Sequence, residues 1–167
     1  MPSMHALSVP VYEKMLGNLA AILDKAAAFA AQKKVEPAVL LGMRLAPDMF
    51  PLTRQVQIAC DFAKGSVARL AGQEPPKWDD TEASFDELKA RIARTVEFIR
   101  GFAAAEVNAG ETRRITLTLR GETRVVDGMP YLLTMALPNF YFHATTAYAI
   151  LRHAGVDLGK RDFIGAV

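Results

Sequence analysis

Apolar residues recur every three or four positions in four segments of the chain, which is the spacing of an amphipathic helix. These segments span residues 9–32, 51–72, 85–105 and 129–155. Ser8, followed two residues later by Pro10, predicts where the first helix begins. Four helices that each carry one apolar stripe bury those stripes most simply against one another. The pattern therefore predicts an all-α four-helix bundle.

The last segment carries polar residues beside its apolar stripe. The stripe itself consists of Leu133, Leu137, Phe140, Ala144, Ala147 and Leu151. Pro138 lacks a backbone donor and predicts a short lead-in helix, with the main helix starting at about that residue. Asn139 and His143 lie one turn apart, so their side chains can reach a common point at the edge of the core. We expect the two side chains to be in contact and energetically coupled.

The connections between the helices have patterns of their own. Ser84 and Glu87 have the spacing of a capping box at the start of the third helix. Before it, residues 73–80 are polar and proline-rich, which is typical of a connection that runs over the surface. After it, residues 114–120 alternate between apolar and polar, and Gly121 precedes a second short run at 123–126. This pattern predicts a small β-hairpin before the last helix.

Composition and charge narrow the class of protein. The length of 167 residues suits one domain, which we assign to residues 1–167. The net charge of +2 and the absence of a basic run argue against a nucleic-acid partner. No apolar run approaches the ~20 residues that span a bilayer, so we expect no membrane partner and a cytoplasmic location. Cys60, the single cysteine, is expected to be a small buried hydrophobe.

Several stretches resemble one known group of proteins. They are FHATTAYAILRHAG at residues 142–155, RLAPDMFPLTRQVQIACDFAKG at 44–65 and LGKRDFIG at 158–165. Together they resemble a bacterial family of unknown function within the DinB/YfiT-like superfamily of four-helix bundles, many of which are metal-dependent enzymes. The resemblance covers nearly all of the chain. It implies the same bundle fold, with the hairpin before the last helix.

The resemblance also implies where a metal would lie. In metal-binding members, one histidine of the second helix and two of the last helix, one turn apart, hold a divalent metal. Here His143 matches one of the last-helix positions, but the position one turn earlier is Asn139. The second helix has no histidine, and its nearest polar candidates are Gln57 and Asp61. An amide is a poor ligand for zinc, nickel or iron, so we expect no metal or other cofactor.

Two functions follow from these residues. The first is a small-molecule-binding or interaction module without a metal, whose weakly indicated ligand-binding residues are His143, Asn139, Gln57 and Asp61. In that case His143 is a structural histidine, hydrogen-bonded to Asn139, Tyr141, Thr146 or a group on the second helix. The alternative is a transferase or hydrolase that depends on divalent zinc, nickel or iron and uses His143 with Asn139 and either Asp61 or Gln57. In that case the metal ligands would be His143 and Asp61, with Asn139 in support. The residues do not identify catalytic groups.

Two further expectations concern surfaces. Arg54, Gln57, Asp61 and Lys64 follow one another at helical spacing, and we interpret them as a solvated face with weak ion pairs rather than as the lining of a cleft. Apolar residues also cover much of the first helix and one side of the hairpin, at Ile115, Leu117 and Leu119. Such surfaces must be covered, so we expect a two-fold homodimer. Bundles of the resembling group often pair as well.

Overall fold

The computed structural model describes residues 2–119 and 121–166. Arg120, the last residue of the predicted first strand, and the side chain of Leu119 lie outside the described part of the chain. The described residues form four long helices, α1 (Met4–Lys33), α3 (Leu52–Leu70), α4 (Phe85–Arg100) and α7 (Leu137–His153). These helices confirm the predicted four-helix bundle.

Short elements connect the long helices. The short helices are α2 (Pro37–Leu41), α5 (Ala104–Asn108), α6 (Gly128–Tyr131) and α8 (Lys160–Ile164). The strands are β1 (Arg114–Leu119) and β2 (Glu122–Asp127), which pair antiparallel from Arg114 opposite Asp127 to Leu119 opposite Glu122. The hairpin therefore lies before the last long helix, as predicted.

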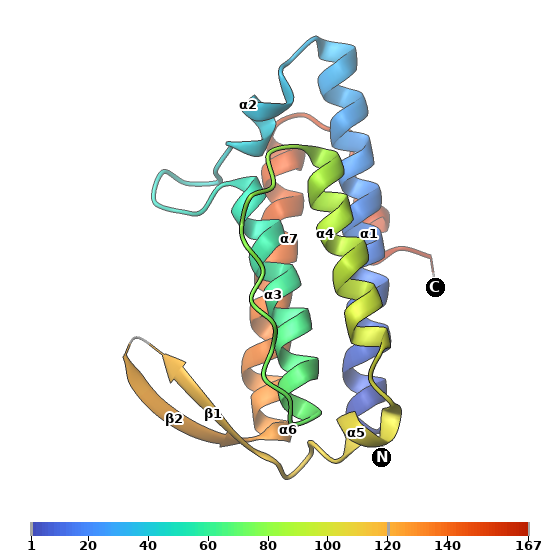
Figure 1. The fold of residues 1–167 in the computed structure, drawn as a ribbon. Helices are drawn as coiled ribbons and strands as arrows, with labels where there is room; N and C mark the ends of the chain where they lie inside the picture. The colour runs from blue at the N-terminus through green and yellow to red at the C-terminus, as the bar shows by residue number, and fades with distance from the viewer. Residues whose placement is uncertain (1, 120, 167) are drawn as a thin grey trace.

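One long connection determines the direction of the helices. Figure 1 shows that α1 and α7 run one way along the bundle, whereas α3 and α4 both run the opposite way. Two consecutive helices can be parallel only if the chain between them returns along the whole bundle. Residues 73–83 make that return beside α3, and we call them the strap. The prediction of a surface connection was right, but the strap also covers side chains of α3.

The first helix begins earlier than its sequence predicted. Ser3, not Ser8, is the N-cap, and its hydroxyl accepts a hydrogen bond of 3.2 Å from the backbone N–H of Ala6. The helix continues through Pro10, whose missing N–H removes one backbone hydrogen bond. Ser8 lies inside the helix and donates its hydroxyl to the carbonyl of Met4 at 2.7 Å. The proline was therefore misread as a helix start.

Two other helix boundaries differ in instructive ways. The third helix was expected to reach residue 105, but α4 ends at Arg100 with Gly101 as its C-cap, and the chain restarts as α5. The lead-in to the last helix is confirmed as α6, followed by a π-helical turn, η1 (Leu132–Ala136), directly before Pro138. A wider turn is a usual way to accommodate a proline ring within a continuous helix.

The apolar surfaces that predicted a dimer are covered within one chain. On α1 most of the wide apolar band is buried, including Leu16, Leu19 and Ile22, and Ala20 and Phe29 are partly buried against the core. On the hairpin, Ile115 and Leu117 are only 4% and 7% exposed. These surfaces therefore give no reason for self-association. In the described part of the chain, none of the helices has the length and apolar character needed to cross a membrane.

Candidate functional site

His143 belongs to a short chain of hydrogen bonds between α7 and α3. Its Nδ1 lies 2.7 Å from Oε1 of Gln55, a side chain that is 1% exposed. The other end of the same amide, Nε2 of Gln55, donates to the backbone carbonyl of Phe50 at 3.0 Å. Figure 1 shows α3 and α7 side by side. The amide of Gln55, on the first turn of α3, links His143 of α7 to the loop that precedes α3. His143 is thus bonded to a group on the second long helix, one of the predicted alternatives.

This chain of bonds fixes the tautomer of His143. A carbonyl can only accept a hydrogen bond, so the Phe50 carbonyl requires the NH2 group of Gln55 to point toward it. The amide oxygen of Gln55 then faces His143, and Nδ1 must carry the proton. Nε2 consequently holds a lone pair.

The Nε2 atom of His143 is not fully buried. The structure gives it no hydrogen-bond partner among the described residues. Among those residues, the one buried side-chain nitrogen or oxygen without a partner is Nε of Arg91. Nε2 of His143 has no partner and is not such a buried atom, so it keeps some contact with solvent, although the residue as a whole is only 9% exposed. The site therefore presents one hydrogen-bond acceptor.

The imidazole lies among aromatic rings. Phe62 is stacked with it at 6.0 Å between ring centroids, and Phe142 meets it edge-on at 5.2 Å. Phe142 is itself 55% exposed and lines a shallow hollow of about 360 Å³. The other residues of this hollow are apolar or hydroxylic: Leu45, Tyr141, Thr145, Thr146 and Ala149. An apolar surface thus adjoins the histidine.

The electrostatic surroundings favour a neutral imidazole. Burial lowers the pKa of His143 from its ordinary value of 6.5, and the positive charge of Arg54 lowers this pKa further. At neutral pH the ring is uncharged, so Nε2 keeps its lone pair. Such an atom can accept a hydrogen bond or a proton, or can ligate a metal.

Asn139 does not share this site as predicted. Its Nδ2 donates to the backbone carbonyl of Met135 at 2.7 Å, within the π-helical turn before α7. The wider turn leaves carbonyls less well satisfied by backbone amides, and the asparagine side chain satisfies one of them. The expected contact with His143 is therefore replaced by a local bond.

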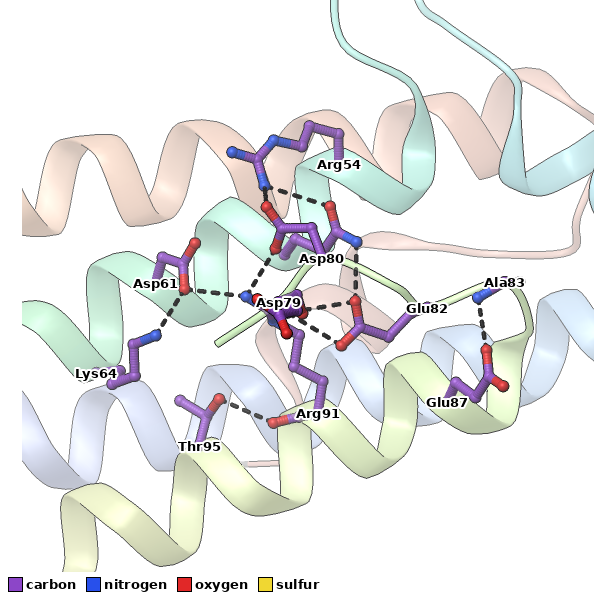
Figure 2. A network of polar contacts seen from close by, with 11 residues as sticks. Arg54, Asp61, Lys64, Asp79, Asp80, Glu82, Ala83, Glu87, Arg91 and Thr95 are labelled. Carbon is purple, nitrogen blue, oxygen red and sulfur yellow. Dashed lines mark hydrogen bonds and ion pairs between the residues drawn. The ribbon is translucent and has the colours of Figure 1, made fainter. Parts of the chain in front are cut away.

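Gln57 and Asp61 belong to a different cluster, centred on Arg91 of α4 (Figure 2). The Arg91 side chain is 2% exposed. Its Nη2 lies 3.1 Å from Oδ1 of Asp61 and 3.0 Å from Oδ1 of Asp80, while Nη1 lies 3.0 Å from Oε1 of Glu82. Gln57 completes the cluster by donating to Oε2 of Glu82 at 2.8 Å. One guanidinium thus joins α3, α4 and the strap.

Further cations extend this cluster along α3. Arg54 pairs with Asp80 of the strap, as Figure 2 shows. Lys64 lies 2.9 Å from Asp61 and 4.1 Å from the ring centroid of Trp78, also of the strap. The interpretation of this row as a solvated face was wrong, because Gln57 and Lys64 are only 3% and 4% exposed. The strap covers them.

The predicted metal ligands do not fit a divalent metal. Asp61 is held by Lys64 and Arg91, and Asn139 is held by a backbone carbonyl. Within residues 2–119 and 121–166, no three side chains of the His, Cys, Asp or Glu type are grouped to hold an ion. His143 alone offers a free nitrogen, and one imidazole is not a metal site. Cys60 is fully buried as expected, and burial raises the pKa of its thiol to about 12.

Sequence reasoning missed Gln55 and Arg91, although both left a signal. Gln55 lies one turn from Leu52 and Ala59, which belong to the buried stripe of α3. Arg91 lies between Leu88 and Ile92 of the buried stripe of α4. A polar or charged residue in such a stripe must find a partner when it is buried.

Comparison with known proteins identifies the family of this chain. The family model described as "Domain of unknown function (DUF1993)" matches residues 4–164. The crystal structure of a DinB family member protein from Shewanella denitrificans is similar, with 51% sequence identity and a TM-score of 0.90 over 96% of this chain and 91% of that chain. Comparison with curated proteins found no significant match. The chain therefore belongs to the DUF1993 family, within the DinB-like superfamily.

Proposed function

We propose that this protein binds a small molecule without a metal, and that the ligand donates a hydrogen bond to Nε2 of His143. One observation carries the proposal. The bonds from His143 through Gln55 to the Phe50 carbonyl fix the imidazole tautomer and leave its second nitrogen as an acceptor at the surface. Because burial and Arg54 lower the pKa of His143, the acceptor persists at neutral pH.

The surroundings of His143 suggest the kind of ligand. Phe62 and Phe142 lie against the ring, and the adjoining hollow is lined mostly by apolar atoms. Such a surface favours an apolar or aromatic body, with a few polar contacts to set its orientation. The proposed ligand therefore carries an O–H or N–H donor on an apolar or aromatic body.

NMR of protein with ¹⁵N-labelled histidine rings tests this proposal. Phenol serves as the probe, and anisole, which has the same ring but no donor, serves as its matched control. We expect phenol to shift the Nε2 resonance of His143 and anisole to leave it in place. His153, at the exposed end of α7, provides an internal control in the same sample. An equal response to both probes, or no response up to the solubility limit of phenol, contradicts the proposal.

The metal-dependent transferase or hydrolase is the alternative outcome. It requires His143 with Asn139, and either Asp61 or Gln57, to hold zinc, nickel or iron. Metal analysis of protein purified without a histidine tag distinguishes the two functions. A near-stoichiometric metal that is lost in His143→Ala would replace our proposal with this one. Retention of the same trace metal in wild type and His143→Ala would agree with ligand binding without a metal.

A further inference from the structure

Arg54 begins a row of side chains along α3 that leads to His143. Arg54, Ile58 and Phe62 are spaced four residues apart, so their side chains follow one another on one face of the helix. All three residues are partly buried. The row extends over ~12 Å, because an α-helix rises about 1.5 Å per residue. At its far end, Phe62 stacks on the ring of His143.

His143 lies beside this row rather than beyond it. Its ring stacks on Phe62 near one end of the row and bonds to Gln55, the residue that follows Arg54, near the other. The imidazole is therefore closer to Arg54 than the whole length of the row. In agreement with this placement, burial and then the positive charge of Arg54 lower the pKa of His143.

The guanidinium of Arg54 is held in place but keeps unused donors. Its Nη1 donates to Oε1 of Gln57 at 3.3 Å and pairs with Asp80 (Figure 2). Nε and Nη2 have no hydrogen-bond partner among the described residues, and neither is a fully buried atom. The side chain as a whole is 35% exposed. Nε and Nη2 share one edge of the guanidinium plane, so together they can bind both oxygens of a carboxylate.

We propose that the ligand of the His143 site is a hydroxylated aromatic carboxylate. Its carboxylate binds Nε and Nη2 of Arg54, and its hydroxyl donates to Nε2 of His143. This inference rests on the proposed function, since it assigns the class of ligand for the same site. The neutral imidazole nitrogen accepts a hydrogen bond, whereas a guanidinium can only donate. A molecule that joins the two must carry a donor at one end and an acceptor at the other, and Ile58 and Phe62 offer apolar surface to the ring between them.

Binding of small aromatic acids at neutral pH tests the class of ligand. The probes are para- and meta-hydroxybenzoate, with the methyl ester of each, which lacks the charge, and benzoate, which lacks the hydroxyl, as matched controls. We expect one hydroxybenzoate to bind about fivefold more tightly than its ester and than benzoate, as measured by calorimetry. The same compound should shift the Nε2 resonance of His143.

Two results would overturn the inference, and they differ in what they mean for the proposed function. Equal affinities for the acids and their esters, or for the acids and benzoate, overturn the inference alone if phenol still shifts the Nε2 resonance of His143. The absence of any shift of this resonance with phenol and with both acids overturns the proposed function together with the inference.

Substitution of Arg54 tests its role. We expect Arg54→Gln to weaken binding of the hydroxybenzoate about fivefold and to leave binding of its ester unchanged. Arg54→Lys should recover only part of the loss, because an ammonium cannot form the paired contact. Arg94→Gln, at an exposed arginine of α4, is the matched control and should bind the acid as wild type does. An equal loss in Arg54→Gln and Arg94→Gln would overturn the assignment to Arg54.

Asp80→Asn separates direct binding from an effect of the strap. Arg54→Gln and Asp80→Asn both break the ion pair between Arg54 and Asp80, but only Asp80→Asn keeps the guanidinium. Because Asp80 competes with the ligand for Arg54, we expect Asp80→Asn to bind the hydroxybenzoate at least as tightly as wild type. A shift of the Nε2 resonance with phenol confirms that the site is folded in each variant. Weaker binding of the acid in both variants would mean that Arg54 acts by holding the strap, and would overturn the proposal.

Discussion

Two polar regions adjoin α3, and they use buried polar groups in opposite ways. Toward α7, His143 and Gln55 form an uncharged chain of bonds that ends in one free acceptor at the surface. Toward α4 and the strap, Arg91 contacts three carboxylates, and its one free nitrogen, Nε, is buried. Nε2 of His143 keeps some contact with solvent, whereas Nε of Arg91 is buried. The comparison therefore supports our proposal of ligand binding at the first region and points to a stabilising role for the second.

The largest expected effect comes from the charged region. Arg91→Met removes the cation and leaves the carboxylates of Asp61, Asp80 and Glu82 close together without compensation. Breaking a buried ion pair by removing one partner costs ~3–5 kcal/mol, and we expect about 3 kcal/mol because Asp61 and Asp80 are partly exposed. Urea denaturation measures the loss.

Arg94→Met is the control for this variant. Arg94 is exposed and lies 4.1 Å from the ring centroid of Trp78, so its loss should cost less than about 1 kcal/mol. Similar costs for the two arginines would mean that the cluster around Arg91 does not stabilise the fold, and the comparison would fail.

A smaller effect is expected from pH. Burial acts to raise the pKa of Glu82, but hydrogen bonds from Arg91 and Gln57 outweigh it, and the pKa lies below its ordinary value of 4.5. The unfolded chain therefore takes up a proton before the folded chain does. The stabilisation by Glu82 is complete above pH 4.5 and is lost as pH falls through the lower folded pKa.

Glu82→Gln should remove this dependence. We expect the variant to lose about 2 kcal/mol at pH 7, because a charge-assisted hydrogen bond is replaced. Its deficit relative to wild type should shrink as pH falls below 4.5. Thermal melts at a series of pH values measure both effects, with exposed Glu74→Gln as the matched control in the strap. A deficit that is constant with pH would refute this account of Glu82.

The uncharged region should show a weaker but specific coupling. His143→Leu should cost ~1–3 kcal/mol because it leaves Gln55 without its partner. In a double-mutant cycle with Gln55→Leu, we expect a coupling of about 1 kcal/mol. The same cycle with Asn139→Ala should be additive within ~0.5 kcal/mol, because Asn139 bonds to Met135 instead. If the cycle with Asn139→Ala showed the coupling and the cycle with Gln55→Leu were additive, Asn139 rather than Gln55 would be the partner of His143.

The smallest expected change is in the pKa of His143. Arg54 contributes positive charge near the ring, so Arg54→Gln should make protonation easier and raise the pKa of His143. The pKa should stay below 6.5, because burial is the larger cause. NMR titration of the His143 ring in wild type and in Arg54→Gln measures both pKa values. A fall in this pKa, or a rise above 6.5, would show that Arg54 acts on the ring in another way.

The elements of the fold were predictable because their signals are local. Apolar spacing identified all four helices, and Ser84 caps α4 by accepting from the amide of Glu87, as its spacing indicated. The start of α1 was missed because the signals at Ser8 and Pro10 are ambiguous. A proline occurs both near the first turn and, less often, within a helix.

The candidate site was less predictable because its partners are distant in the sequence. His143 was identified, but its partner Gln55 lies 88 residues away along the chain. Asn139 lay within reach at helical spacing and was chosen for that reason. The row on α3 was interpreted as solvated because helical periodicity cannot show that a strap will cross it. The available signal was Trp78, the single tryptophan of the chain. A large aromatic side chain in a polar segment indicates that the segment packs against the rest of the protein.

The strap has a further consequence for hydrogen exchange. Its backbone lies outside any helix or strand, and side chains of α3 and α4 hold it in place. Segments with few backbone hydrogen bonds open at a lower free energy than the core helices do. We therefore expect the strap to detach as one cooperative unit while the four helices stay folded. Proteolytic cleavage within it would then report this local opening rather than global unfolding.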